Sequence, residues 1–286
     1  MNAIFHYRSV DNVDKRCEHL RVLRMSLEQF FFYNNDIPVF LITDTDDIKI
    51  PGVTNIPLPD NNNINNIIEN YKHMSTNPVE FELACLLRWF DIENFLKEIA
   101  DKCVYIESDI LVYDDIKCWF DIAKNYKCTL TGKQIASPMI VNDHTIISEF
   151  TNFITNTYNK SNNVLGKMEK IYEKMTYNKT PGGVSDMLFL KWFLSDRSDV
   201  LPELDMHEVD NAVFDYHLGH LNAYPKYNWE HVYNEDIYKN IKKISFHNRK
   251  PTCKNLLTGN EKIFRSLHFL GSNKKIMHKY TYENFS

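Results

Sequence analysis

Two acidic residues, Glu107 and Asp109, directly follow the short apolar run Cys103–Ile106. The apolar run predicts a buried strand, and ligands of open α/β sheets bind beyond the carboxyl ends of the strands. Residues i and i+2 of an extended chain face the same side, so the two carboxylates repel each other unless a cation neutralises them. Carboxylate oxygens suit Mg²⁺ or Mn²⁺, so the pair predicts a metal site. A solvated turn is the alternative interpretation.

A second group of residues with chemical potential lies near the end of the chain. His268, Gly271 and Lys274 recur at three-residue intervals within and after the apolar segment Ser266–Leu270. Imidazole is a good ligand for Mn²⁺, glycine lets the backbone approach an anion closely, and lysine supplies a positive charge for phosphate. Together with the acidic pair, these residues predict a site for a metal ion and a diphosphate.

Both groups match a known family. Glu107-Ser-Asp109 resembles the acid-x-acid motif of GT-A glycosyltransferases, and His268-x-x-Gly271-x-x-Lys274 resembles the C-terminal motif of their family-8 retaining members. The resemblance implies that Glu107, Asp109 and His268 bind Mn²⁺ (or Mg²⁺) on the diphosphate of a nucleotide sugar. The chain departs from the family pattern at Glu107, where an aspartate is usual, so the local geometry must accommodate an extra methylene. The donor-binding residues implied here are Ser108, Gly271 and Lys274.

The segment Thr180–Met187 contains an adjacent glycine pair followed by an acidic residue. It is similar to the glycine-glycine-x-x-aspartate element of related sugar transferases, which implies that Asp186 binds donor-sugar hydroxyls or orients the acceptor, while Gly182 and Gly183 admit the sugar. A helix cap is the alternative for Asp186. Arg88 resembles the arginine that many GT-A enzymes carry on the helix before the acid-x-acid strand, which implies contact with the donor sugar or phosphate. A structural ion pair is the alternative.

The ends of the first two predicted strands offer candidates for the nucleoside. Phe5, Tyr7 and Arg8 provide aromatic surface and hydrogen-bond donors where GT-A folds hold the base and ribose, and Asp44 ends the second strand. Packing in the core is the ordinary use of such aromatic residues. His247, in the segment Ser245–Pro251, also ends an apolar strand and competes with His268 for the metal, although its loop lacks the glycine.

Hydrophobic periodicity predicts the elements that position these residues. A strand, a helix and a strand at residues 3–7, 13–33 and 37–43 form a unit that requires a parallel sheet. The remainder alternates in the same way, and the asparagine-rich residues 61–66 indicate a polar connection. We therefore expect an α/β fold: one GT-A (Rossmann-like) domain over residues 1–286, with a mostly parallel sheet flanked by helices. Residues 1–125 form its nucleotide-binding half and residues 126–286 its half for donor sugar and acceptor. The other predicted strands lie at 53–57, 103–106, 127–131, 138–142, 212–216 and 243–247, and the other helices at 79–100, 143–158, 164–176 and 184–195.

Composition limits the classes of partner. The net charge is -5 and the basic residues are scattered among acidic ones, which argues against a nucleic-acid partner. The chain contains no signal-peptide pattern and no apolar run long enough to cross a bilayer, so we expect a cytoplasmic protein. The 6 cysteines contain no C-x-x-C pair and are expected to be reduced and structural.

These features together predict a metal-dependent glycosyltransferase that moves a hexose from a nucleoside-diphosphate sugar to a glycan, protein or small-molecule acceptor. The family resemblance implies a UDP-sugar donor and retention of the anomeric configuration. An inverting enzyme would need a general base, for which Asp186 is the candidate. Two alternatives are a nucleotide-sugar-binding protein without turnover and an aspartyl-phosphate phosphatase. Glu107, standing where the phosphatase needs its aspartate nucleophile, argues against the latter.

Overall fold

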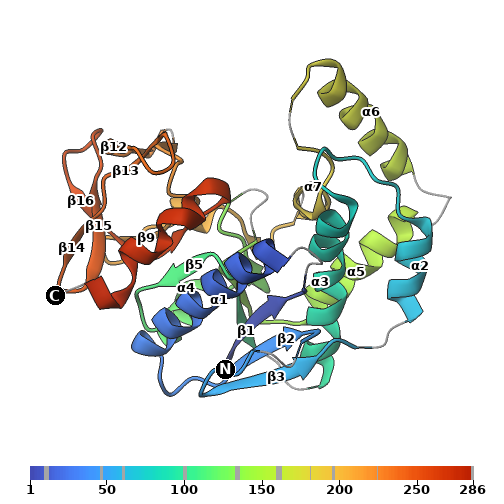
Figure 1. Cartoon of the computed structure of the whole chain (residues 1–286), viewed down its shortest axis with the longest axis horizontal. Coiled ribbons are helices and arrows are strands. Elements are labelled where there is room, and N and C mark those ends of the chain that lie inside the picture. The colour runs from blue at the N-terminus through green and yellow to red at the C-terminus, as the bar shows by residue number, and fades with distance from the viewer. Residues whose placement is uncertain are drawn as a thin grey trace.

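The computed structural model describes residues 1–9, 13–45, 48–59, 62–98, 102–132, 136–158, 163–180, 182–194, 197–223 and 225–284. They form an α/β fold in which helices cover both faces of a mostly parallel central sheet, as the sequence predicts (Figure 1). A second, smaller sheet forms the C-terminal end of the molecule.

The central sheet has the strand order β3-β2-β1-β4-β7-β6-β8. Its parallel part comprises β1 (Asn2–Tyr7), β2 (Val39–Thr43), β3 (Val53–Pro57) and β4 (Cys103–Ile106). Beyond β4, the strand β7 (Met139–Val141) runs antiparallel, followed by β6 (Cys128–Thr129) and β8 (Val200–Leu201). The inner strands are nearly continuous apolar runs because both of their faces are covered.

Alternation along the strands divides the core into two layers. Phe5 and Val104 face α1 (Val13–Tyr33) and α4 (Lys117–Ala123). Ile4 and Tyr105 face the opposite layer, formed by α3 (Val79–Glu98), α5 (Thr145–Tyr158) and α7 (Asp186–Leu194). Two further helices, α2 (Asn62–Asn70) and α6 (Asn163–Tyr177), pack against α5 (Figure 1).

The second sheet has the order β14-β15-β16-β5, with β9 also paired to β16. Its strands are β5 (Ile110–Val112), β9 (Ala212–Phe214), β14 (Ser245–His247), β15 (Lys250–Lys254) and β16 (Glu261–His268). Two small pairs lie beside it, β10 (Asn222–Ala223) with β11 (Tyr227–Asn228) and β12 (His231–Asn234) with β13 (Lys239–Lys242). The 3₁₀ helices are η1 (Leu204–Met206), η2 (Gly271–Tyr280) and η3 (Tyr282–Asn284).

One predicted connection differs from the observed structure. The asparagine-rich stretch, whose first residue lies outside the described residues, is helical from Asn62, because Ile64 and Ile67 recur at helical spacing and are buried against the core. Burial of this apolar face stabilises a helix that the polar composition does not suggest.

Both sheets take strands from either side of residue 125. Strands β6, β7 and β8 extend the central sheet, while β5 from the first half joins the second sheet. We therefore propose one domain with interwoven halves. The 6 cysteines are free of disulfides, as expected. Within the described part of the chain, we find no helix with both the length and the apolar character that a membrane crossing requires.

Candidate active site

The carboxyl end of β4 brings the two motifs together. The chain turns at Glu107 and Asp109 and enters β5, which pairs antiparallel with β16 so that Ile110 lies opposite His268. The backbone amide of Phe269 also donates a hydrogen bond to the carbonyl of Asp109, at 2.9 Å. Strand pairing between β5 and β16 thus places the end of one predicted motif beside the start of the other.

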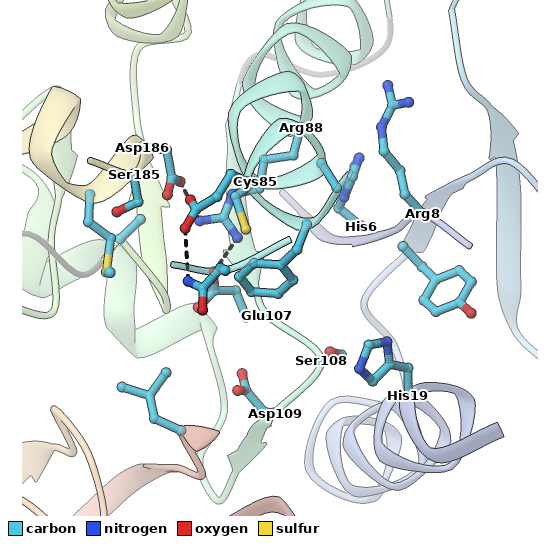
Figure 2. Close-up of a pocket in the computed structure, with 18 of the residues that line it drawn as sticks. His6, Arg8, His19, Cys85, Arg88, Glu107, Ser108, Asp109, Ser185 and Asp186 are labelled. Carbon is cyan, nitrogen blue, oxygen red and sulfur yellow. Dashed lines mark hydrogen bonds and ion pairs between the residues drawn. The ribbon is translucent and has the colours of Figure 1, made fainter. Parts of the chain in front are cut away.

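Glu107, Asp109 and His268 form a cluster suited to a metal ion. One ligand atom from each residue lies within 4.8 Å of the others. His268 Nε2 is 3.4 Å from Asp109 Oδ1 and 3.8 Å from Glu107 Oε2. The two acidic residues lie at the carboxyl end of the central sheet (Figure 2). Two carboxylates and one imidazole constitute a donor set appropriate for Mn²⁺ or Mg²⁺.

The imidazole of His268 is oriented for ligation. Its Nδ1 lies 3.1 Å from the backbone carbonyl of Tyr216, which can only accept a hydrogen bond. Nδ1 therefore carries the hydrogen, and in the neutral ring Nε2 carries the lone pair. Nε2 is buried and has no hydrogen-bond partner among the described residues. Such an orphaned acceptor facing two carboxylates fits a cation between them.

Charges around Asp109 reinforce one another. Lys274 Nζ is 3.1 Å from Asp109 Oδ2. Burial alone would raise the pKa of Asp109, but the ammonium of Lys274 and the imidazole of His268 hold it well below its usual range. The Asp109 carboxylate in turn raises the pKa of Lys274. For His268, burial would lower the pKa, yet Asp109 and Glu107 raise it. The site thus keeps its carboxylate ionised and its lysine charged.

Asp215 positions His268 from behind, a role that our sequence analysis missed. Its Oδ2 accepts a hydrogen bond from the backbone amide of His268 at 3.0 Å, and its Oδ1 pairs with Lys242 Nζ at 2.9 Å. Asp215 and Lys242 are both buried. Asp215 follows the apolar strand β9 directly, which is the same signal that identified Glu107.

Arg88 connects two of the predicted elements. Its Nη1 pairs with the Glu107 carboxylate, and its Nη2 donates to Asp186 Oδ2 at 2.6 Å (Figure 2). Trp89 Nε1, which the sequence analysis did not single out, donates to the same Asp186 oxygen at 2.9 Å. Burial would lower the pKa of Arg88, but Asp186, Tyr105 and Glu107 raise it well above its usual value. The structural ion pair is therefore present, and Arg88 also lines the cavity.

The glycine pair is explained by backbone contact. A Cβ on Gly183 would lie 2.3 Å from the carbonyl oxygen of Met74 and the Cα of Ser75, and Gly182 has φ +97°. The segment pairs with residues 74–76, where Val184 N donates to Met74 O at 2.8 Å. The space beside Gly183 is thus filled by the preceding segment of the chain. Both glycines nevertheless line the cavity, as does Asp186.

The first strand end is only partly as predicted. Tyr7 and Arg8 line the cavity, whereas Phe5 is fully buried and packs edge-to-face on Phe30. The prediction that Phe5 contacts the nucleoside is therefore wrong, because alternation along β1 turns its side chain toward α1. Asp44 is outside the lining and accepts hydrogen bonds from Ser9.

A buried carboxylate missing from the sequence analysis holds the end of β1. Arg8 donates from Nε and Nη2 to Asp91 of α3 at 2.8–3.1 Å, and His6 Nε2 lies 2.8 Å from the same side chain. Asp91 is 1% exposed. Asp91 lies 83 positions from Arg8 along the chain, so no local pattern marks it as a neighbour of the end of β1.

The remaining candidates are resolved by their surroundings. Ser108, which lies between the two acids in the sequence, lines the cavity on the side of His19 (Figure 2). Gly271 begins η2 with φ +59°, and a Cβ there would meet nothing within 4 Å, so its backbone conformation accounts for the glycine. His247 is exposed and lies 3.6 Å from Glu261 on the second sheet. It is absent from the metal cluster, so His268 rather than His247 stands beside the carboxylates.

A cavity of about 330 Å³ is lined by the Glu107–Asp109–His268 cluster, by Lys274 and by Arg88 and Asp186. Its walls come from the end of β1, helix α1, the first turns of α3 and α7, the β4–β5 turn and the start of η2. A cavity of this size, mostly apolar with a few convergent charged groups, is typical of a small-molecule site.

Comparison with known proteins gives similarity in structure only. No protein family model matches the chain, and no curated protein sequence matches it. A galactosyltransferase, LgtC, solved with donor and acceptor sugar analogues, is 10% identical with TM-score 0.41, covering 71% of this chain and 73% of that one. Mouse xyloside xylosyltransferase 1 is 7% identical with TM-score 0.44, covering 71% and 84%. GlyE from Streptococcus pneumoniae is 14% identical with TM-score 0.38, covering 72% and 45%.

All three are glycosyltransferases. With TM-scores below 0.5, these similarities assign no donor, acceptor or residue role to this chain.

Proposed function

We propose that this protein is a metal-dependent glycosyltransferase that transfers a hexose from a nucleoside-diphosphate sugar, a UDP-sugar, to an acceptor. The observation that carries the proposal is the buried Nε2 of His268, which faces the carboxylates of Asp109 and Glu107 at 3.4 and 3.8 Å without a hydrogen bond of good geometry. Lys274 lies beside the Asp109 carboxylate and provides a positive charge for phosphate.

Glu107, Asp109 and His268 would hold a divalent cation, Mn²⁺ in our proposal, on the diphosphate. The cation supplies charge neutralisation of the departing nucleoside diphosphate. Lys274 contributes a second positive charge, fixed before the reaction by its contact with Asp109. Gly271 and Ser108 bring backbone and hydroxyl groups to the same side of the donor.

Arg88 and Asp186 would bind the donor sugar. Arg88 and Trp89 both donate their hydrogen bonds to Oδ2 of Asp186, and we assign Oδ1 to a sugar hydroxyl. Because Oδ2 already accepts these two hydrogen bonds, it is not free to take a proton from an acceptor hydroxyl. This supports retention, with the acceptor attacking on the face from which the diphosphate leaves. We further propose a cytoplasmic location.

The test is release of nucleoside diphosphate from a panel of UDP- and GDP-sugars with Mn²⁺ or with EDTA. We expect slow, Mn²⁺-dependent release from one UDP-sugar, lost in Asp109→Asn and in His268→Ala. Saturable, Mn²⁺-dependent binding without release from any donor, in water or with added acceptors, would instead support a binding protein without turnover. Absence of donor binding would contradict the site itself.

A further inference from the structure

The first turn of α3 holds a buried carboxylate that the proposed chemistry does not use. Glu82 lines the cavity and is 3% exposed. Its Oε1 accepts hydrogen bonds from Ser75 Oγ at 2.7 Å and from Asn77 Nδ2 at 2.8 Å. Its Oε2 is buried without a partner among the described residues. A buried acceptor left without a hydrogen bond is costly, so it marks a place for a ligand's donor.

Glu82 lies on α3, away from the Glu107–Asp109–His268 cluster. Glu82 and Arg88 are both on the cavity side of this helix, and their separation of six positions along the chain corresponds to roughly 9 Å at 1.5 Å per residue. Arg88 reaches Glu107 of the metal cluster. The cavity therefore has a charged end for a diphosphate and a second end, beyond Arg88, with a different character.

Apolar side chains flank Glu82 at this second end. Phe81 and Met187 line the cavity, yet they are 45% and 39% exposed, so they form its rim toward solvent. They come from the first turns of α3 and α7, whose starts are tied together by the pairing of Gly183 with Ser75. Exposed apolar groups over a buried carboxylate suit a ligand with one apolar face and several hydroxyl groups.

We propose that Glu82, Phe81 and Met187 form the acceptor subsite, and that it takes a neutral sugar. The inference rests on the proposed transferase function. Phe81 and Met187 cover the apolar face of the sugar ring, and Glu82 Oε2 accepts a hydrogen bond from one of its hydroxyls. No cation pairs with Glu82 in the part of the chain that the structure describes, so an acidic sugar meets uncompensated repulsion there.

The experiment compares Glu82→Gln and Phe81→Ala with two matched controls. Glu80→Gln and Val79→Ala change the same residue classes in the same helical turn, at exposed positions outside the cavity lining. Nucleoside diphosphate release is measured with UDP-sugar and Mn²⁺, alone and with methyl glycosides of neutral hexoses or with glucuronic acid. We expect acceptor-free release within about twofold of the unmodified protein in the two controls, Glu80→Gln and Val79→Ala.

The acceptor-dependent release distinguishes a sugar-binding role of Glu82 and Phe81 from a purely structural one. We expect a neutral glycoside to accelerate release. Its KM should rise about tenfold or more in Glu82→Gln, as for loss of a hydrogen bond to a charged group, and by a similar factor in Phe81→Ala, which loses the apolar contact. The KM should be unchanged in the controls. Glucuronic acid should give no acceleration. Equal KM values in all variants, or preference for glucuronic acid, overturn the subsite.

Binding provides a readout that does not depend on turnover. Saturation-transfer NMR with the methyl glycosides, in the presence of UDP and Mn²⁺, should detect a bound sugar in the unmodified protein and a weaker signal in Phe81→Ala. If none of the glycosides binds, the subsite assignment is wrong even where nucleotide release confirms a transferase. If a glycoside binds at Phe81 without any release, the subsite stands and the transferase function fails.

Discussion

The guanidinium of Arg88 links the Glu107–Asp109–His268 cluster to Asp186, the residue that we propose binds the donor sugar. One of its nitrogens pairs with Glu107 and the other with Asp186. A planar fork can serve two carboxylates at once, whereas a lysine ammonium is a single point charge on a flexible stem. The geometry of Arg88 therefore matters as well as its charge.

We predict that Arg88→Lys lowers kcat for nucleotide release on the order of 100-fold, because misplacing Glu107 or Asp186 by about 1 Å has an effect of this size. Donor binding measured by calorimetry should weaken much less, since the charge is kept. Lys97→Arg, on the last turn of the same helix, provides the control. Unchanged kcat in Arg88→Lys would mean that the two carboxylates need no common partner.

The buried carboxyl group of Asp205 leads to a prediction about how the free energy of unfolding depends on pH. Burial raises its pKa to about 7 from an ordinary 3.8, with Glu203 and Asp215 adding to the effect. Because the folded state binds the proton more tightly, this group's stabilising contribution is complete below pH 3.8 and is lost as the pH rises through about 7. Between pH 5 and 8 the free energy of unfolding should fall by roughly 2–3 kcal/mol on its account.

In Asp205→Asn this part of the pH dependence should disappear, which urea unfolding at pH 5 and pH 8 can measure. Asp121→Asn, at an exposed position on α4, should leave it unchanged. A pH profile that is the same in Asp205→Asn and in the unmodified protein would show that another group is responsible.

Among the elements, the start of α7 and the segment before α3 can come into contact because Gly183 has no side chain. A Cβ at Gly183 would overlap backbone atoms of Met74 and Ser75, which cannot move as a flexible side chain would. We predict that Gly183→Ala lowers the free energy of unfolding by about 1–3 kcal/mol and separates Asp186 from Arg88. Thermal unfolding and nucleotide release should both be affected.

Gly259→Ala is the matched control for that prediction. Unlike Gly183, Gly259 has a positive φ, of +76°, and a Cβ there meets nothing within 4 Å. It should therefore show only the smaller cost of backbone strain, without loss of activity. If the two variants are equally destabilised, steric overlap at Gly183 is not the cause.

Elements with a clear period were predictable, whereas those stabilised by distant contacts were not. The strand Cys103–Ile106 and its acidic turn follow from an unbroken apolar run, and α1 follows from its spacing. The pairs β10–β11 and β12–β13 consist of strands of two to four residues, too short for a period to be recognised. Residue chemistry suggested His268 as a partner of the acidic pair, and the family resemblance supported that link. Asp91 escaped notice because its partners come from another element, whereas Asp215 directly follows an apolar strand, as Glu107 does, and could have been found by that signal.

At the scale of the whole molecule, the metal cluster lies where the two sheets meet. Glu107 follows β4 of the central sheet, and His268 ends β16 of the second sheet. A cation held by both would oppose unfolding of either sheet. At a Mn²⁺ concentration about 100 times the Kd, the stabilisation is about 2.7 kcal/mol, and the Tm should rise by roughly 5 °C.

Thermal scans with Mn²⁺ and with EDTA would measure this shift. Asp109→Asn should abolish it, and Asp236→Asn, at an exposed position in the turn between β12 and β13, should retain it. A shift that persists in Asp109→Asn would place the bound cation elsewhere.

The six unbridged thiols have a practical consequence. Cys17 is exposed, whereas the other five cysteines are buried or partly covered. It lies on α1, the helix that also contributes His19 and Val22 to the cavity wall. A maleimide fluorophore would therefore react first at Cys17 without prior removal of the other thiols. Its emission would then report, in real time and in single molecules, when a ligand enters or leaves the cavity.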